Sequence, residues 1–130
     1  MEIILDTNFI ITAIKQKAQL FEQLEELFPN CKILIPIQVI EELEKIPNSK
    51  QEKLIDRESA SLALQIIKKK SVQNIEFTAK NVDAGIVRYT KEKKDLIIAT
   101  LDKQLKQKIK DKNPKVQFLT IKEKKRISLQ

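Results

Sequence analysis

The sequence predicts an α/β protein in which helices cover both faces of a mostly parallel, five-stranded sheet. Two observations support this fold class. Short apolar segments alternate along the chain with segments of helical periodicity. The chain has 130 residues, of which 42% are hydrophobic, and this is enough for one buried core. We therefore expect residues 1–130 to form a single domain whose parallel strands end at a common edge.

The first part of the chain is predicted to contain one strand and two helices. Residues 3–5 are an apolar run, typical of a strand buried on both faces, that ends at Asp6. Spaced isoleucines in residues 10–14 indicate a short helix after it. Residues 20–28 carry an apolar stripe and precede Pro29, so a second helix is expected to stop there.

A second strand and two further helices are expected next. Residues 33–35 form the strand. A helix should begin at Pro36, because proline suits the first turn, and should stop at Pro47. A longer helix is predicted over residues 51–70. The residues expected on its buried face include Leu54, Ile55, Leu62, Ala63 and Ile67.

The last part of the chain continues the alternation and completes the five strands. Val116, Phe118 and Thr120 alternate with polar residues, as expected of a final strand at the sheet edge. The elements predicted here are, in order, a strand within 72–77, a helix around 82–87, a strand at 96–100, a helix around 105–109, the strand at 116–120 and a basic tail at about 122–130.

The composition excludes several kinds of site. The only glycine, Gly85, rules out glycine-rich nucleotide loops, and the absence of histidine rules out imidazole catalysis. The single cysteine, Cys31, forms no internal disulfide and cannot build a usual zinc site. No apolar run approaches the roughly 20 residues that cross a membrane, and the start lacks the basic region of a signal peptide. We therefore expect a cytoplasmic protein without membrane contact.

Three aspartates are predicted to meet at the edge where the strands end. Asp6 follows the first strand, Asp102 comes just after the fourth, and Asp83 lies in the first turn of the helix after the third. Each alone has a simpler interpretation, Asp6 as a helix cap and Asp83 as a charge that complements a helix dipole. Their convergence on one edge favours a role in chemistry.

A fourth acid is expected from the helix that begins at Pro36. At 100° per residue, Glu41 falls nearly opposite the apolar face, whereas Glu42 and Glu44 fall near its two rims. Helical geometry therefore leaves Glu42 and Glu44 as alternatives.

A cluster of acids indicates a bound metal ion. Ionised carboxylates repel one another unless a cation is present, and oxygen donors favour Mg²⁺ or Mn²⁺. Such ions activate water, which suits hydrolysis of a phosphodiester without histidine. Thr100, Thr7 and Asn8 are candidates to orient the carboxylates, although threonine and asparagine at such junctions are equally well explained as helix caps.

The net charge is +7, and the excess lies late in the chain. A basic surface favours a polyanionic partner such as RNA, although solvated lysine-rich surfaces are also common. The candidate RNA contacts are the lysines Lys103, Lys106, Lys108 and Lys110.

Four segments together resemble a PIN domain, and the resemblance spans nearly the whole chain. They are ILDTNFI at residues 4–10, PIQVIEEL at 36–43, Asp83, and IATLDKQL at 98–105. The most similar PIN nucleases process small-subunit ribosomal RNA or are archaeal, toxin-type (VapC-like) ribonucleases. The resemblance implies a three-layer α/β/α sandwich and endonucleolytic RNA cleavage with one or two Mg²⁺ or Mn²⁺ ions.

The resemblance also implies site residues. The register of residues 36–43 selects Glu42 over Glu44. The acids that carry over to catalysis and metal binding are Asp6, Glu42, Asp83 and Asp102, with Thr100 as the neighbouring hydroxyl. The chain departs from the family pattern at one position. Many PIN domains have a further acid directly after the third acid, whereas Asp83 is followed here by Ala84. This departure bears on how a second metal ion would be held.

The implied partners are RNA, an antitoxin or a pre-ribosomal particle, and a second copy of the chain in a homodimer. An RNA-binding PIN protein without cleavage is the main alternative to an endoribonuclease. A phosphatase-type fold is a second alternative, although such folds generally want a further acid where Thr7 and Asn8 stand.

Overall fold

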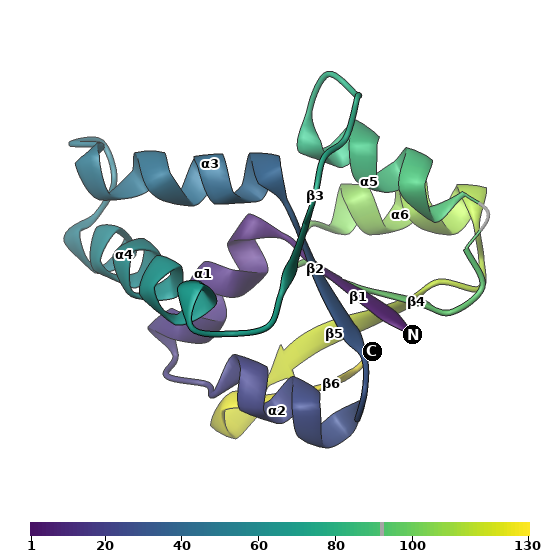
Figure 1. Cartoon of the computed structure of the whole chain (residues 1–130), viewed down its shortest axis with the longest axis horizontal. Coiled ribbons are helices and arrows are strands. Elements are labelled where there is room, and N and C mark those ends of the chain that lie inside the picture. Colours follow the sequence, from purple (N-terminus) through teal and green to yellow (C-terminus); the bar gives the residue numbers. More distant parts are fainter. Residues whose placement is uncertain (92) are drawn as a thin grey trace.

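β1 lies inside a six-stranded sheet with the strand order β3-β2-β1-β4-β5-β6 (Figure 1). The computed structural model describes residues 1–91 and 93–130. β2 to β5 run parallel to β1, and β6 is antiparallel to β5. The strands are β1 (Glu2–Leu5), β2 (Lys32–Pro36), β3 (Gln73–Ile75), β4 (Leu96–Ala99), β5 (Gln117–Lys122) and β6 (Arg126–Leu129). The predicted α/β fold with a mostly parallel sheet is confirmed.

Helices lie on both sides of the sheet. α1, α3 and α4 pack together on one side of the carboxyl edge, and α5 packs against α6 on the other (Figure 1). None of the helices within the described residues is long and apolar enough to span a membrane. The helices are α1 (Thr7–Lys15), α2 (Leu20–Leu27), α3 (Ile37–Lys45), α4 (Leu54–Lys68), α5 (Val82–Thr90) and α6 (Lys103–Lys112), with short 3₁₀ turns η1 (Ile46–Asn48) and η2 (Glu123–Lys125).

The direction of strand addition reverses at β1. The chain adds β2 and β3 on one side of β1, and β4 and β5 on the other. Ile3 is aligned with Ile33 of β2 and with Ile97 of β4. Such a reversal leaves a crevice at the carboxyl ends of the two strands that flank it, and ligands of open α/β sheets bind there. Here the crevice lies at the ends of β1 and β4.

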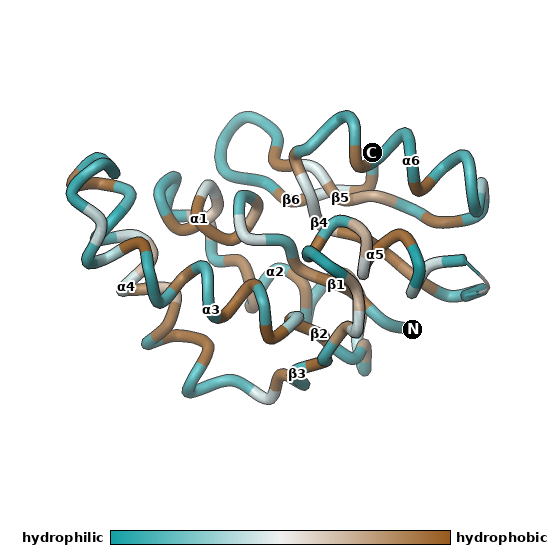
Figure 2. Tube along the Cα trace, turned by 90° about the horizontal axis from the view of Figure 1, so that it is seen from above, coloured by the Kyte–Doolittle hydropathy of each residue, from teal (hydrophilic) through white to brown (hydrophobic). Residues whose placement is uncertain are grey.

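The central strands form the middle of the core. Ile3, Ile4 and Leu5 of β1 are completely buried, as are Ile97 and Ile98 of β4. Figure 2 shows hydrophobic stretches along these strands and hydrophilic residues toward the periphery. A strand buried on both faces cannot shift without exposing apolar surface, so the position of the residue that follows it is well determined.

The sheet has six strands, not the five predicted, and residues 126–129 form β6 instead of a basic tail. β5 is therefore not at the edge. Ile127 of β6 is almost fully buried, and its backbone N–H donates a 2.8 Å hydrogen bond to Gln23 Oε1 of α2. Gln23 also donates through Nε2 to the carbonyl of Lys125. The strand was missed because its apolar residues are few and stand among charges, so contacts with α2 decide its course.

The long helix is shorter and less buried than predicted. It spans α4, Leu54–Lys68, instead of residues 51–70, and Leu54, Ile55 and Leu62 are 60%, 52% and 46% exposed. The buried residues of α4 are Ser59, Ala60, Ala63 and Ile67. Most side chains of this stripe are small, and this face of α4 packs against α1 and α3.

Candidate active site

Asp6 and Asp102 are connected through Thr100 in the crevice between β1 and β4. Asp6 directly follows β1 and is 8% exposed. The Thr100 hydroxyl donates a 2.7 Å hydrogen bond to Asp6 Oδ2 and accepts one of 3.2 Å from the backbone N–H of Asp102. Thr100 is completely buried. Its hydroxyl therefore holds the two acidic strand ends together.

Both aspartates also cap helices, as the simpler interpretation of Asp6 expected. Asp6 Oδ1 accepts the N–H of Thr7 at 2.9 Å. Asp102 Oδ1 accepts the N–H groups of Gln104 and Leu105 at 2.9 and 3.1 Å. Capping therefore anchors one oxygen of each carboxylate. A carboxylate has about four acceptor positions, so capping leaves both groups able to bind a cation.

Asp83 and Glu42 come from helices on opposite sides of the carboxyl edge of the sheet. Asp83 lies half-buried in the first turn of α5, whose N-cap Asn81 accepts the N–H of Ala84 at 2.8 Å. Glu42 is an exposed residue of α3. The negative charges of both residues act on Asp6. Each of the four predicted acids is therefore near enough to another of them for their charges to interact.

The pKa values show that these acids interact. Burial raises the pKa of Asp6; the hydrogen bonds from Thr100 and Thr7 oppose the rise, and the charges of Asp83 and Glu42 add to it. Burial also raises the pKa of Asp83, to which the charge of Asp102 adds and which the charge of Lys108 opposes. Holding these carboxylates ionised at neutral pH therefore costs free energy without a cation.

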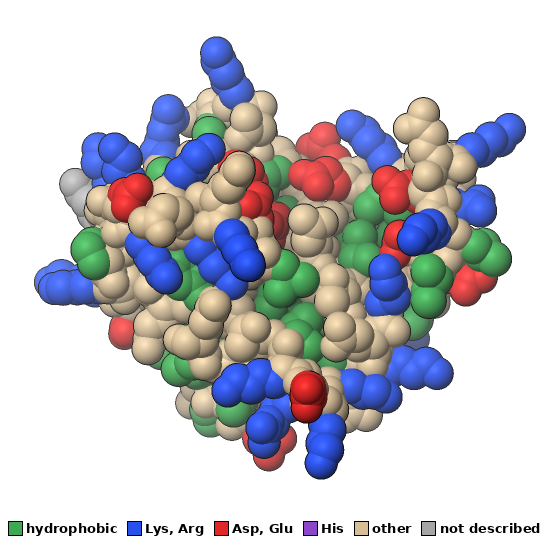
Figure 3. Space-filling view, turned by 180° about the vertical axis from the view of Figure 1, so that it is seen from behind, with side chains coloured by type: hydrophobic (Ala, Val, Ile, Leu, Met, Phe, Trp, Pro, Cys, Tyr) green, Lys and Arg blue, Asp and Glu red, His purple; other side chains and the backbone are tan. Residues whose placement is uncertain are grey.

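The donor chemistry fits a hard divalent cation. Within residues 1–91 and 93–130, no three acidic or cysteine side chains form a compact metal-binding group, and none of the four acids is paired with a lysine or arginine. Figure 3 shows acidic side chains around the hollow between the two groups of helices, with lysine and arginine side chains around them. Oxygen ligands and repelling charges suit Mg²⁺ or Mn²⁺ better than zinc or copper.

Comparison with known proteins decides the family. A family model described as a PIN like domain matches residues 3–122. The chain belongs to the PIN-like domain family. Ribonuclease VapC4 of Methanocaldococcus jannaschii is 34% identical over 113 residues, which cover 86% of this chain and 85% of that protein.

Solved structures agree with the family. The PIN domain endonuclease Utp24 matches with a TM-score of 0.77 and 32% identity, over 99% of this chain and 90% of that one. VapBC2 from Rickettsia felis, bound to a DNA fragment from their promoter, matches with a TM-score of 0.51 and 23% identity, over 82% of this chain and 92% of that one. The second likeness supports the fold alone.

Two grooves flank the acids of this PIN domain. The α5–α6 groove, of about 480 Å³, is bordered by Asp83 and four cations, and the α1–α3 groove, of about 640 Å³, by Glu42 and a mixture of charges. The cations of the first are Arg88, Lys91, Lys108 and Lys112. The other charged residues of the second are Lys15, Lys45, Glu52 and Asp56.

The four lysines predicted to bind RNA do not share one surface of the PIN domain. Lys108 lines the α5–α6 groove, whereas Lys106 Nζ donates a 2.7 Å hydrogen bond to Gln130 Oε1 beyond β6. Lys110 Nζ lies 5.5 Å from the centroid of the Phe118 ring of β5. Lys103 is exposed at the start of α6. Lys106 and Lys110 are thus turned to the β5–β6 hairpin.

The structure differs from the predicted site at Asn8 and at three cations of the α5–α6 groove. Asn8, predicted to orient a carboxylate, is exposed in the first turn of α1 and lines the α1–α3 groove; within the described part of the chain it makes no hydrogen bond to Asp6. The sequence reasoning missed Arg88, Lys91 and Lys112 as groove residues. Lys108 and Lys112 are one helical turn apart, but so are Lys106 and Lys110, so spacing alone did not single out the pair in the groove.

Proposed function

We propose that this PIN domain is a Mg²⁺- or Mn²⁺-dependent endoribonuclease that hydrolyses RNA phosphodiester bonds. The observation that carries the proposal is the Thr100 bridge, which holds Asp6 beside Asp102 at the strand-order reversal. The charges of Asp83 and Glu42 act on the same carboxylate. The names of two relatives, Ribonuclease VapC4 and the PIN domain endonuclease Utp24, support the same activity.

The residues of the chain have separable roles in this proposal. Asp6, Glu42, Asp83 and Asp102 would hold the ion, and the chemistry that a bound Mg²⁺ or Mn²⁺ supplies is Lewis-acid activation of water and the phosphodiester. Thr100 orients Asp6 by donating to Oδ2, and the capping bonds hold Asp102 at the start of α6. The chain has no histidine, so proton transfer falls to carboxylates and water.

The cellular role has two versions within this proposal. In the first, the protein is a toxin-type ribonuclease with an antitoxin as its partner, in keeping with its relation to Ribonuclease VapC4. In the second, it processes ribosomal RNA within a pre-ribosomal particle. Action in the cytoplasm and assembly into a homodimer stay predictions of the sequence in either version.

One observation favours a second candidate, an RNA-binding PIN protein without cleavage. The four acids influence one another but do not form a compact metal-binding group among the described residues. Binding to RNA is common to both candidates, and only metal-dependent cleavage separates them.

The deciding experiment is a cleavage assay with end-labelled RNA that contains single-stranded and hairpin regions. Wild type should cleave with Mn²⁺ or Mg²⁺, stop in EDTA and resume when the ion is restored. Asp6→Asn should lose at least about 1,000-fold in rate, because a Lewis acid contributes several kcal/mol to such a reaction. The exposed Asp95→Asn is the matched control and should cleave normally. Equal cleavage by Asp6→Asn would refute the assignment, and binding without cleavage would support the second candidate.

Thermal unfolding separates loss of the site from loss of the fold. The pKa of Asp6 is higher in the native state than in the unfolded chain, so the native state binds more protons between these two pKa values. The free energy of unfolding therefore falls as the pH rises from the unfolded pKa through the native one. At neutral pH the ionised carboxylate is therefore destabilising. Asp6→Asn should have a Tm without metal no lower than that of wild type, and Mn²⁺ should raise the Tm of wild type more than that of the variant.

A further inference from the structure

The lysines of α6 are divided between two opposite faces of the helix. At 100° per residue, Lys108 and Lys112 share one face, and Lys106 and Lys110 share another about 160° away. Lys106 and Lys110 face the β5–β6 hairpin through Gln130 and Phe118. Lys108 and Lys112 line the α5–α6 groove. One helix therefore carries two lysine pairs of equal charge in different surroundings.

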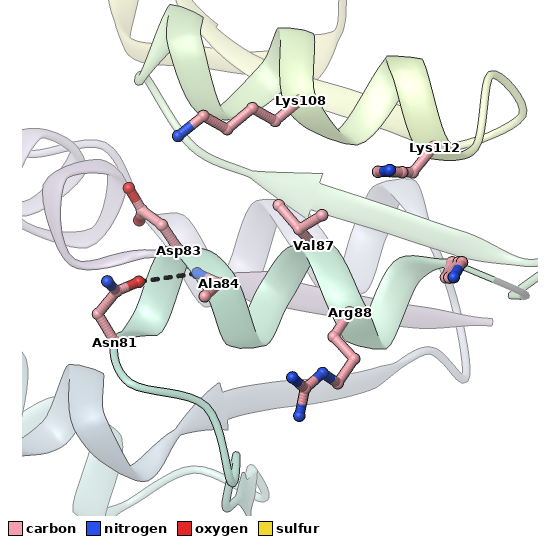
Figure 4. A pocket seen from close by; sticks show the side chains of 8 residues that line it. Asn81, Asp83, Ala84, Val87, Arg88, Lys108 and Lys112 are labelled. Carbon is pink, nitrogen blue, oxygen red and sulfur yellow. Dashed lines mark hydrogen bonds between the residues drawn. The ribbon is translucent and has the colours of Figure 1, made fainter.

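The opposite wall of the groove comes from α5 and adds two cations. Figure 4 shows Val87 turned toward α6, Lys108 extended toward Asp83, and Lys112 at the other end of the groove. Arg88 points to the outer side of α5, where it borders the opening. Within residues 1–91 and 93–130, none of the four cations of this groove forms an ion pair. Apart from the attraction between Lys108 and Asp83, the described residues thus leave these charges available to a ligand.

The groove and the candidate active site share Asp83. This residue lines the groove, and the charges of Asp102 and Lys108 both act on it. A chain that enters the crevice at Asp6 and Asp102 can therefore continue between α5 and α6. The series of cations leading away from a group of acids matches a polyanion whose reacting phosphate sits at the acids.

We propose that the α5–α6 groove binds the phosphate backbone of the RNA on one side of the scissile bond, with Lys108 and Lys112 as binding residues. This inference rests on the proposed function. No aromatic ring is among the described residues that line the groove, and its apolar surface comes from Ala84 and Val87. Bases therefore have no stacking platform there, and recognition in this groove depends on phosphates and not on base identity.

The test compares two double variants that remove equal charge from the same helix. Lys108→Gln/Lys112→Gln alters the groove, and Lys106→Gln/Lys110→Gln alters the hairpin face. Binding of fluorescent 12-nucleotide oligo(U) and oligo(A) is measured in EDTA at several NaCl concentrations. The groove variant should lose about tenfold in affinity for both RNAs, and the slope of log K against log salt should fall by about 1.4, because two single-strand phosphate contacts are lost. The hairpin-face variant should stay within about threefold.

Kinetics and rescue distinguish a loss of RNA binding from a loss of folding. With Mn²⁺, the groove variant should raise KM and leave kcat nearly unchanged. Lys108→Arg/Lys112→Arg should restore affinity, and Tm values report on folding of every variant. Equal losses in the two double variants, a loss confined to one RNA, or no binding by wild type would each overturn the proposal.

The outcomes also separate this inference from the proposed function. Groove-dependent binding by a wild type that never cleaves would refute the endoribonuclease and leave the groove in place. Metal-dependent cleavage with equal effects of both lysine pairs would refute the groove alone.

Discussion

The α5–α6 groove and the α1–α3 groove lie on either side of the same acids but differ in charge. The first has four cations and one acid, whereas the second has two lysines and three acids. In the second, Lys15 is already paired with Asp56 at 2.7 Å. The net charge of +7 therefore does not describe either groove. Which groove suits a polyanion depends on which faces of the helices the fold brings together.

The α1–α3 groove differs from its neighbour in polarity as well. Thr7 is buried beside Asp6, and among the described residues its hydroxyl has no hydrogen-bond partner. Thr7 and the exposed Asn8 both line this groove. Its polar surface thus consists of hydroxyl, amide and carboxylate groups, and only Lys45 adds a cation outside the pair of Lys15 and Asp56.

Among the variants that test this comparison, the largest effect should come from Thr100, which lies between the two grooves at the acids. Thr100→Val removes the hydroxyl that binds Asp6 and accepts the N–H of Asp102. Cleavage or Mn²⁺ affinity should fall about 10- to 100-fold, as for other residues that orient metal ligands. Thr100→Ser retains the hydroxyl and should remain close to wild type in a metal titration of the cleavage rate. If valine and serine behave alike, the bridge does not position the acids.

An intermediate effect is expected from the buried side of α5, the helix that forms one wall of the α5–α6 groove. Gly85 is buried in α5, and an added Cβ would lie 2.4 Å from the Phe77 ring. The carbonyl of Phe77 accepts a 3.1 Å hydrogen bond from Gln38 of α3, which restricts its movement. Gly85→Ala should therefore lower the free energy of unfolding by about 1–3 kcal/mol, despite the better helix propensity of alanine.

Urea unfolding of a double variant provides the control for this steric argument. The cost of Gly85→Ala should be smaller in a Phe77→Ala background, since alanine lacks the Cγ and Cδ2 atoms that lie 2.5 and 2.4 Å from the added Cβ. A Gly85→Ala protein that is more stable than wild type would show that Phe77 moves freely and that its contact with α5 is not fixed.

The smallest effect should follow from removing the lysines of the α1–α3 groove. Lys15→Gln/Lys45→Gln removes as much charge as the groove variant of α6, yet RNA affinity should change by less than about twofold. Three acids offset these lysines, and exposed pairs such as Lys15–Asp56 interact weakly with solvent present. A tenfold loss in the same binding assay would show that both grooves hold phosphates and would remove the contrast between them.

Several features of this site could be predicted from local sequence. Asp6 and Asp102 follow buried strands, and parallel strands end at one edge, so their proximity followed from element order. Helical geometry narrowed the choice of the fourth acid to Glu42 and Glu44. The resemblance to PIN domains then selected Glu42, whose charge acts on Asp6. The roles of the four acids in metal binding stay a prediction until the Asp6 variant is tested.

The sequence by itself determined the α/β class, the order of the parallel strands along the chain and the acids at their ends, because these depend on short-range periodicity and on general rules of sheet connection. Only the tertiary structure decided that residues 126–129 pair as β6, that Leu54 and Ile55 stay exposed, and that Lys108 and Lys106 serve different surfaces. The physical reason is that a helix face or a weak strand is defined locally, whereas its neighbour comes from residues far away in the chain, as Gln23 and Ile127 show.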